Sequence, residues 1–397
     1  MSAFQIRFGG FKGVVSIDPN LVGKQLQFRK SMKKFESGYN RLDVLNLAEY
    51  IPCFLNRQVI VILSSLGVED KAFSDLLDQS LKTINCLLIN NQVASDFLIQ
   101  YYRPIVSSTS INTFNLNYTF EPFFRDLLKT IQQKMLTDLL KKSRIFVPKG
   151  RILMGTIDET RTLKENEVFI QCKYGLLDTP NSFEGTINDK FAKTFIVNSK
   201  IAVAKNPCMH PGDIRTLTAV NNHALHHMFD CIVFPSVGNR PITNMCSGSD
   251  LDGDLYLVTW EPSLIPVMQE EPMDYGSGKA KEETEPISIN QVIEFFVNFI
   301  KVDQLGRIAN AHVAISDSSM RGVKDPMCLK LAKIFSQAVD FPKTGFVAEI
   351  PSEIQKLQYP DFMEKKGTWY FSQKIIGKMY RKCKQISTGE FDFDKVG

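Results

Sequence analysis

The chain has 397 residues, 44% of them hydrophobic, which is enough for two or more domains with substantial cores. Its net charge of +4 excludes a global basic field, so any nucleic acid must be bound by local patches. No apolar run approaches the roughly 20 residues needed to cross a bilayer, and the eight cysteines form no Cys-x-x-Cys pair. We expect an intracellular protein with reduced thiols and no membrane partner.

The N-terminal residues predict strands that carry a basic cluster. Residues 4–8, 13–17 and 24–30 have strand-like patterns and are separated by turn signals. From charge alone, a solvated strand edge is favoured over a phosphate-facing surface, because lysines commonly protect exposed edges. The cluster comprises Arg7, Lys12, Arg29, Lys30, Lys33 and Lys34.

The next part of the chain predicts helices. Residues 56–65 and 70–99 have helical periodicity, with Gly67 as a breaker between them. A long helix begins at Glu121-Pro122 and ends near Lys142, with apolar side chains on one face. We interpret these helices as packing or spacer elements.

After this helix the pattern returns to short strands. Small closed barrels are built from such regularly spaced strands. Lys149, between Pro148 and Gly150, is either part of an ordinary turn or a phosphate contact. The predicted strands are residues 144–147, 151–154, 168–173, 195–203 and 232–234.

Polar residues near the end of this region are candidates for binding or structural roles. Lys205, His210 and Arg215 are candidate contacts to RNA or a nucleotide, and Arg240 could hold a triphosphate through bidentate hydrogen bonds. Three histidines have a spacing that suggests a metal, but no acid or thiol follows at a ligand-like interval, so a structural role is favoured. They are His223, His226 and His227.

The segment from Cys246 to Trp260 contains the strongest functional pattern. It places Asp250, Asp252 and Asp254 at alternate positions, directly before an apolar strand-like run. Carboxylates this close repel one another and raise each other's pKa unless a cation is present. Mg²⁺ prefers such oxygen ligands, and two ions would suit in-line phosphoryl transfer.

The aspartate pattern has three alternative interpretations. A solvated acidic turn does not require three aspartates, whereas a buried structural acid cluster would still need cations nearby. The aspartates and Glu261 also match positions of an EF-hand, but Leu255 occupies its glycine position and a strand replaces the following helix. Metal preference would decide whether the chain is a calcium-binding module.

The C-terminal part predicts a loop and several helices. Residues 268–287 carry mixed charge with Gly and Pro, which indicates a mobile loop. Ser288 is expected to cap a helix that carries Val292, Phe295, Phe296 and Ile300 on one face. Further helices are predicted at residues 305–316, 328–339 and 372–383.

Several sequence blocks together resemble one family. Ser-Gly-Ser-Asp-Leu-Asp-Gly-Asp, residues 247–254, is similar to the metal-binding signature of the cellular, plant-type RNA-dependent RNA polymerases of RNA silencing. Residues 3–13, 144–151, 204–213 and 339–345 are similar to other family blocks and follow the family order. The resemblance therefore covers essentially the whole chain.

This resemblance implies an α+β fold built around two double-psi β-barrels. Residues 1–55 would form an incomplete first barrel and residues 56–143 a helical connector. Residues 144–265 would form the catalytic barrel, and residues 266–397 a mobile loop and helical region. Because family members are much longer, we expect a chain truncated at both ends.

The resemblance also implies template-directed synthesis of RNA. The chain would use Mg²⁺, with Mn²⁺ as an alternative, to copy single-stranded RNA from nucleoside triphosphates. The double-stranded product would enter small-RNA silencing in the nucleus or cytoplasm, with partners such as a dicer-type nuclease. The alternative is a catalytically silent RNA-binding relative of the polymerase.

The family pattern assigns roles to individual residues of this chain. Asp250, Asp252 and Asp254 would hold the metal and act in catalysis with Lys12 and Lys34. Nucleotide or RNA contacts would come from Arg7, Lys149, Lys205, His210, Arg240 and Lys343.

Overall fold

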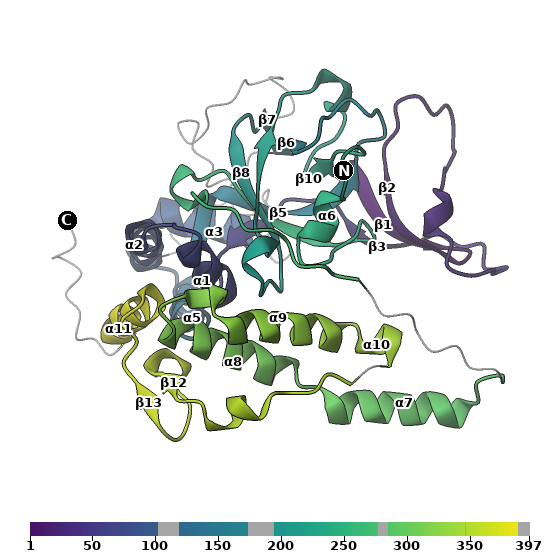
Figure 1. Cartoon of the computed structure of the whole chain (residues 1–397). Helices are drawn as coiled ribbons and strands as arrows, with labels where there is room; N and C mark the ends of the chain where they lie inside the picture. Colours follow the sequence, from purple (N-terminus) through teal and green to yellow (C-terminus); the bar gives the residue numbers. More distant parts are fainter. Residues whose placement is uncertain (102–118, 174–193, 277–284, 346, 388–397) are drawn as a thin grey trace.

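The computed structural model describes residues 1–101, 119–173, 194–276, 285–345 and 347–387. A β-barrel forms one side of the molecule, and a layer of helices lies below it (Figure 1). A small sheet made by the N-terminal residues extends from the barrel. This arrangement confirms the predicted α+β class.

Six strands close the barrel in the order β10–β5–β11–β8–β9–β6, because β6 pairs again with β10. The β5–β10 and β6–β9 pairs are parallel, whereas the other pairs around the barrel are antiparallel. Strand β4 adds to β5, and β7 adds to β6. The bounds are β4 Pro52–Phe54, β5 Phe146–Ile157, β6 Glu167–Lys173, β7 Thr194–Ile196, β8 Lys200–Lys205, β9 Arg215–Ala219, β10 Cys231–Phe234 and β11 Leu255–Thr259.

Apolar side chains from these strands form a core. Leu153, Ile170, Val203, Ile232 and Tyr256 are each buried in one cluster that joins five strands of the barrel. A six-stranded barrel is narrow, so its interior is filled by side chains rather than by a channel. The closed and filled barrel is a rigid support for the loop that precedes β11.

Two expected strand boundaries were wrong. The predicted strands at 144–147 and 151–154 form the single strand β5, in which Gly150 lies against Cys53 of β4 and the backbone of β11. An added Cβ at Gly150 would lie 2.9 Å from the Cys53 Cβ, so this glycine permits close strand approach and does not mark a turn. The predicted strand 195–203 is divided into β7 and β8.

The N-terminal sheet contains β1 Ala3–Phe8 between β2 Phe11–Ser16 and β3 Asp43–Leu47. The predicted strand at 24–30 is absent, and only the 3₁₀ turn η1 Lys30–Met32 follows it. Phe28 instead stacks on Phe8 and Phe11, with ring centroids 5.5 and 4.7 Å apart. Phe28 therefore packs across the hairpin rather than within a paired strand, whereas Leu26 is exposed.

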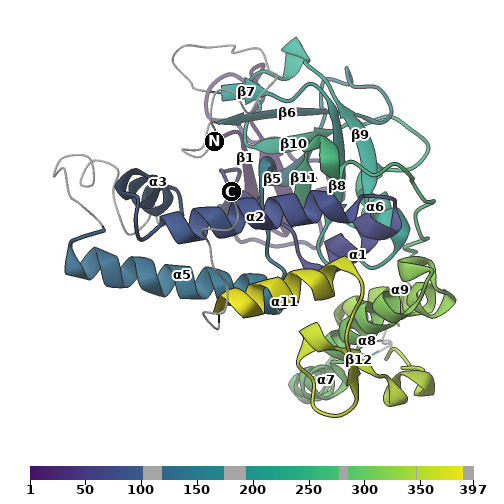
Figure 2. The same ribbon diagram turned by 90° about the vertical axis from the view of Figure 1, so that its left-hand side faces the viewer.

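Helices cover the outer face of the barrel. Apolar residues of α1, α2, α5 and α11 share a cluster with barrel residues such as Ala202 and Leu257, and Figure 2 shows α2 passing beside the strands. The helix expected at 70–99 is two helices, because the Asn90 side chain accepts hydrogen bonds from the amides that begin the second. The bounds are α1 Arg57–Ser65, α2 Asp70–Cys86, α3 Asn91–Tyr101, α5 Pro122–Lys142 and α11 Ile375–Ser387.

The remaining helices follow the barrel in sequence. Ser288 caps α7 through a capping box with Gln291, as predicted, but the helix has no buried residue. Phe295 and Phe299 stack on Phe341, while α8 and α9 pack together. The bounds are α6 Ile242–Met245, α7 Ile289–Val302, α8 Leu305–Ser318, α9 Pro326–Val339 and α10 Phe341–Thr344.

Short elements complete the described fold. The 3₁₀ turns are η3 Pro211–Asp213, η4 His223–Leu225, η5 Pro262–Leu264, η6 Gly322–Lys324, η7 Ser352–Lys356 and η8 Asp361–Met363. Strands β12 Tyr359–Pro360 and β13 Trp369–Tyr370 pair in parallel. Within the described part of the chain, no helix combines the length and apolar character needed to span a membrane.

Candidate active site

The loop that carries the aspartates connects α6 to β11. Its backbone has positive φ values at Ser247, Gly248 and Gly253, of 54°, 65° and 124°. At Gly253 an added Cβ would also meet the Gln5 side-chain amide, which would have to move, so glycine suits both the backbone conformation and the close approach of Gln5. These turns place the loop against β1 of the N-terminal sheet.

The loop brings the three aspartate side chains together. One oxygen from each of Asp250, Asp252 and Asp254 lies within 4.8 Å of the others. The Asp250 amide donates to Asp254 Oδ2 at 3.0 Å, which ties the two ends of the loop. Burial and then the charges of the neighbouring aspartates raise the pKa of Asp250. A bound cation would relieve this repulsion between the three carboxylates.

Two lysines from different sheets contact this cluster. Lys12, on β2, forms an ion pair with Asp252, and Lys205, at the end of β8, lies 3.0 Å from Asp254 Oδ2. Burial acts to raise the pKa of Asp252, but the hydrogen bond and charge of Lys12 hold it below its ordinary value. The site therefore combines residues that are more than 200 positions apart in sequence.

This donor set fits a divalent cation. Carboxylate oxygens are the ligands that Mg²⁺ and Mn²⁺ prefer, and the three carboxylates converge from one short loop. Within the residues that the structure describes, no other group of three or more potential ligands has this geometry. Asp250, Asp252 and Asp254 are therefore the residues able to hold a metal.

Buried hydrogen bonds support the loop from the barrel interior. Tyr256, which is fully buried on β11, donates to the Asp250 carbonyl at 3.0 Å and lies 2.8 Å from Ser249 Oγ. Ser249 donates in turn to the Thr243 carbonyl of α6. The strand that follows the loop thus holds the loop's own backbone.

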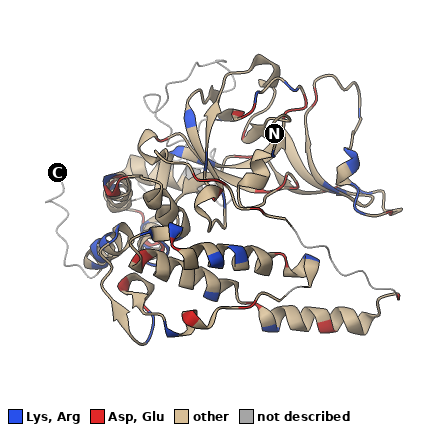
Figure 3. Cartoon of the chain, viewed as in Figure 1, with Lys and Arg blue, Asp and Glu red and all other residues tan. Residues whose placement is uncertain are grey.

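Of the other N-terminal candidates, Arg7 lies on the same sheet and Lys34 lies in the connection between η1 and β3. Arg7 is paired opposite Lys12 across β1 and β2, and its positive charge contributes to lowering the pKa of Asp252. Lys34 is exposed and donates to the Ser31 carbonyl at 3.2 Å. Figure 3 shows basic residues on the turn after β2 and along α9.

Lys149 is placed away from the aspartates. Gly150 pairs with Thr259 at the far end of β11, whereas Met154 pairs with Leu255 beside the metal loop. Five residues of strand separate Lys149 from Met154, a distance of about 16 Å at roughly 3.3 Å per residue. The structure does not bring this lysine to the aspartate cluster.

His210 and Arg240 make structural contacts beside the loop. The Nδ1 atom of His210 accepts a hydrogen bond from the Gly212 amide, and burial lowers the pKa of this histidine. The Arg240 guanidinium donates to the carbonyls of Pro272 and Met273 at 3.5 and 2.7 Å. Both side chains are thus engaged with the protein itself.

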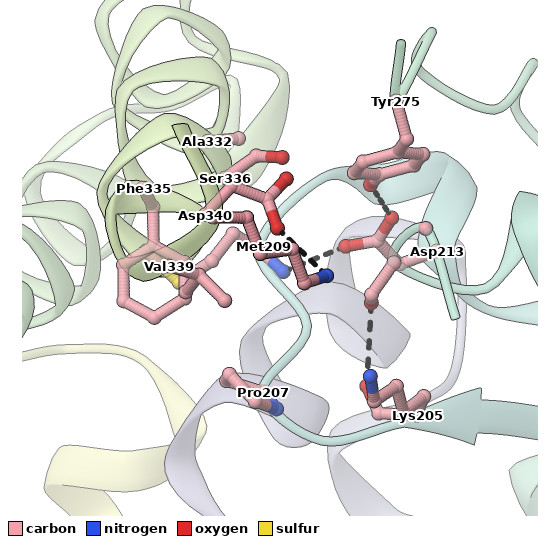
Figure 4. Close-up of a pocket in the computed structure, with 13 residues that line it drawn as sticks. Lys205, Pro207, Met209, Asp213, Tyr275, Ala332, Phe335, Ser336, Val339 and Asp340 are labelled. Atoms are coloured by element: carbon pink, nitrogen blue, oxygen red, sulfur yellow. Dashed lines mark hydrogen bonds and ion pairs between the residues drawn. The ribbon is translucent and has the colours of Figure 1, made fainter. Parts of the chain in front are cut away.

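A pocket of about 110 Å³ separates the metal loop from α9 and α10. Figure 4 shows Lys205 and Tyr275 on one side of it, across from Phe335 and Val339 of α9. Ser247 and Gly248 of the metal loop and Lys343 of α10 also line it. The Asp340 hydrogen bond, followed by the charges of the aspartates, raises the pKa of Lys343 against the opposing effect of burial. The pocket therefore has a lysine on each side next to the metal loop.

Sequence reasoning missed two residues that contact the loop directly. Gln5 donates to the Asp252 carbonyl at 3.0 Å, and Tyr275 packs against Gly248. Gln5 lies within the strand predicted at residues 4–8, where the alternating pattern indicates only that its side chain is on the opposite face from those of its two sequence neighbours. Tyr275 lies in the segment predicted to be a mobile loop, where it was the sole aromatic residue between 268 and 287.

Two alternatives from the sequence are settled by this geometry. The EF-hand reading is wrong, because β11 follows the aspartates and Glu261 instead caps η5, accepting from the Ser263 amide. The His223 and His226 rings are tilted by 49° with centroids 4.6 Å apart, and His226 Nε2 lies 2.7 Å from Asn221 Oδ1. In the described part of the chain, these histidines belong to no metal-ligand group.

The closed six-stranded barrel, with clustered aspartates on the loop before β11, is consistent with the double-psi β-barrel core that the sequence resemblance implied. Residues 1–383 match the family model described as RNA dependent RNA polymerase. The chain belongs to this family, as the sequence resemblance indicated.

Curated relatives support the assignment. Over 97% of its length the chain is 45% identical to "Probable RNA-dependent RNA polymerase 1" of Oryza sativa subsp. japonica, and it covers 50% of that protein. It is 44% identical over 99% of its length to "RNA-dependent RNA polymerase 1" of Arabidopsis thaliana, covering 35% of that protein. The chain thus spans half or less of the length of these relatives.

A solved structure shares the fold. The chain superimposes on "RNA dependent RNA polymerase QDE-1 from Thielavia terrestris" with a TM-score of 0.72 and 19% sequence identity. The match covers 100% of this chain and 50% of that chain. At this identity the likeness establishes the common architecture of the barrel and its helices.

Proposed function

We propose that this chain is a catalytic core that copies single-stranded RNA into double-stranded RNA from nucleoside triphosphates. The observation that carries the proposal is the convergence of three carboxylates within 4.8 Å, flanked by lysines from two different sheets. Negative ligands recruit the metal, while lysines neutralise phosphate charge at the same place. Such a combination suits phosphoryl transfer better than storage or transport of a cation.

The proposed reaction is a nucleotidyl transfer. The 3′-hydroxyl oxygen of the growing strand attacks the α-phosphorus of the triphosphate, forming a phosphodiester bond. The bond from the α-phosphorus to the bridging oxygen breaks, pyrophosphate leaves, and the hydroxyl proton passes to solvent. When bound, Mg²⁺ or Mn²⁺ would lower the pKa of the attacking hydroxyl and stabilise charge on the leaving group.

The surrounding residues have proposed roles in this reaction. Asp250, Asp252 and Asp254 hold the metal, and Lys12 neutralises charge that develops on the phosphates. Lys205 and Lys343 lie on opposite sides of the adjoining pocket, where they can bind the triphosphate.

The remaining basic residues are assigned to more distant contacts. We assign Arg7 and Lys34 to the nucleotide and nascent strand, and Lys149 to RNA backbone further from the metal. His210 and Arg240 would shape the nucleotide site through the backbone groups that they bind.

We also propose the division of the chain that the sequence resemblance suggested. Residues 1–55 would be part of a first barrel, residues 56–143 a connector, 144–265 the catalytic barrel and 266–397 a helical region. The separate three-stranded sheet and the closed six-stranded barrel support the first and third parts. We further propose a role in RNA silencing inside the cell, in the nucleus or cytoplasm, with a dicer-type nuclease as a partner. Family membership supports the RNA polymerase activity on which this role would depend.

The test is nucleotide incorporation on single-stranded RNA with Mg²⁺ or Mn²⁺. The purified chain is compared with the double variant Asp252→Asn, Asp254→Asn, which keeps the side-chain shapes but removes two charges. Asp126→Asn is the matched control, because this aspartate lies on exposed α5 and pairs only with Lys129 among the contacts described for it. Template-dependent product that is lost in the double variant alone is the expected result.

A folded wild-type chain that binds RNA but makes no product would refute the enzymatic proposal for this polypeptide. It would instead favour the second candidate, a silent RNA-binding relative. Product that persists in the double variant would show that the aspartates are not the metal ligands.

A further inference from the structure

The segment of residues 268–276 is held against the catalytic barrel by several side chains. Arg215 donates to the Glu270 carbonyl at 2.8 Å, and Arg240 donates to the Met273 carbonyl at 2.7 Å. The Gln269 side chain accepts from the Thr216 amide at 2.9 Å, and Lys324 of η6 forms an ion pair with Glu270. These contacts join residues 268–276 of the predicted mobile loop to their neighbours, and residues 277–284 of that loop lie outside the described residues.

Tyr275 lies at the end of this segment and contacts two parts of the site. Its hydroxyl donates to Asp213 Oδ1, as Figure 4 shows, and Asp213 is only 2% exposed. The other oxygen of Asp213 accepts from the amides of Met209 and His210 at 2.8 and 2.9 Å. The phenol is therefore joined to a carboxylate that is itself fixed by the barrel.

The same tyrosine packs against the beginning of the metal loop. A Cβ at Gly248 would lie 2.8 Å from the Tyr275 Cβ and 2.9 Å from its Cγ. Gly248 has a φ of 65°, and it stands two residues before Asp250. After Gly248, the next contact that holds the loop is at Asp250, whose carbonyl accepts a hydrogen bond from the Tyr256 hydroxyl inside the barrel. Gly248 is thus an exposed turn residue of the metal loop that is contacted on one side by the Tyr275 side chain.

We propose that Tyr275 is a positioning residue for the metal site. By joining Asp213 and packing against Gly248, it holds the 246–254 loop so that its three carboxylates stay converged for a divalent cation. Tyr256 supports this loop from within the barrel and Tyr275 from the outer surface. The inference rests on the metal-binding part of the proposed function and does not require that the chain synthesise RNA.

The test compares two tyrosine-to-phenylalanine variants of the full chain. Tyr275→Phe removes the hydroxyl and keeps the ring. Tyr370→Phe is the matched control, because the Tyr370 hydroxyl also donates to a buried carboxylate, Asp317, at 2.9 Å, in the C-terminal region. Binding of Mn²⁺ is measured from the electron paramagnetic resonance signal of the free ion, without nucleotide or RNA. Hydrogen exchange at residues 246–254 is measured in parallel.

Tyr275→Phe is expected to weaken Mn²⁺ binding about threefold to tenfold, the range by which losing one hydrogen bond shifts an equilibrium. Exchange in the metal loop should rise, while Tyr370→Phe changes neither quantity. Unchanged Mn²⁺ binding in Tyr275→Phe would overturn the proposal. An equal loss in Tyr370→Phe would overturn it too, because the effect would then be general destabilisation.

A second variant releases the same segment at a different anchor. Arg240→Met removes the donor to Met273 and is expected to weaken Mn²⁺ binding in the same direction. If it leaves Mn²⁺ binding unchanged, the 268–276 segment does not position the loop.

Nucleotide incorporation gives a further separation. In Tyr275→Phe, the Mg²⁺ concentration for half-maximal rate should rise while kcat at saturating Mg²⁺ stays near that of the wild type. A chain that incorporates no nucleotide but responds in Mn²⁺ binding would refute the polymerase proposal and leave this inference standing. A fall in kcat at saturating Mg²⁺, with the Mg²⁺ requirement unchanged, would overturn the inference.

Discussion

Gly155 is the position where one added methyl group should disturb both the barrel and the metal loop. Its amide donates to the Asp254 carbonyl at 3.1 Å, so it lies directly beside the third aspartate. A Cβ there would lie 2.5 Å from Tyr256 Cε2 and 2.9 Å from Leu251 Cδ2. Because the Tyr256 hydroxyl holds the Asp250 carbonyl, a displaced ring would move the loop.

Gly155→Ala should therefore lower the free energy of unfolding by about 1–3 kcal/mol, the usual cost of overpacking a filled core. The ring lies inside the barrel and is fully buried, so it cannot move towards solvent. The displaced loop should also weaken Mn²⁺ binding. Urea unfolding followed by tryptophan fluorescence measures the first effect, and Mn²⁺ titration measures the second.

Gly306→Ala provides the control. This glycine is in α8, and a Cβ there meets nothing within 4 Å, so alanine should be neutral or stabilise by up to about 1 kcal/mol. Combining Gly155→Ala with Tyr256→Leu should cost less than the sum of the single changes, because the smaller side chain relieves the clash. Additive costs, or a stable Gly155→Ala that binds Mn²⁺ normally, would refute this reasoning.

Three further predictions concern charge and capping. Burial and the neighbouring aspartates raise the pKa of Asp250, so this side chain takes up a proton at a pH above the ordinary aspartate pKa. On acidification, Mn²⁺ affinity should therefore begin to decline before the pH reaches that ordinary value. Without metal, the folded state binds the Asp250 proton more tightly than the unfolded state does. Thermal stability should therefore fall as pH rises from the ordinary aspartate pKa through the raised pKa of Asp250, and added Mn²⁺ should reverse this fall. Lys205→Met should tighten Mn²⁺ binding about twofold to fivefold at pH 8, since an ammonium no longer pairs with Asp254, yet reduce nucleotide incorporation. Ser288→Ala should destabilise α7 by about 1 kcal/mol, seen as faster hydrogen exchange at its first amides with no change in barrel unfolding.

Local patterns determined much of the secondary structure. The apolar run after the aspartates forms β11, and Ser288 caps α7 as predicted, through a capping box with Gln291. Both outcomes depend on residues within a few positions of one another. The strand predicted at residues 24–30 does not form, because Phe28 stacks on aromatic side chains of the hairpin and this packing competes with strand pairing. Local strand propensity does not show whether such a segment will pair as a strand or pack on aromatic side chains elsewhere in the fold.

The amino-acid sequence predicts the carboxylates that could hold a metal, because their alternate spacing lies within one short segment, and its blocks match one polymerase family. Which residues support these carboxylates depends on the tertiary structure. Barrel closure by the β6–β10 pair, the approach of Lys12 to Asp252, and the contacts of Tyr275 with Asp213 and Gly248 all join distant segments. Such contacts follow from how strands and side chains pack in space, and a linear spacing does not contain that information.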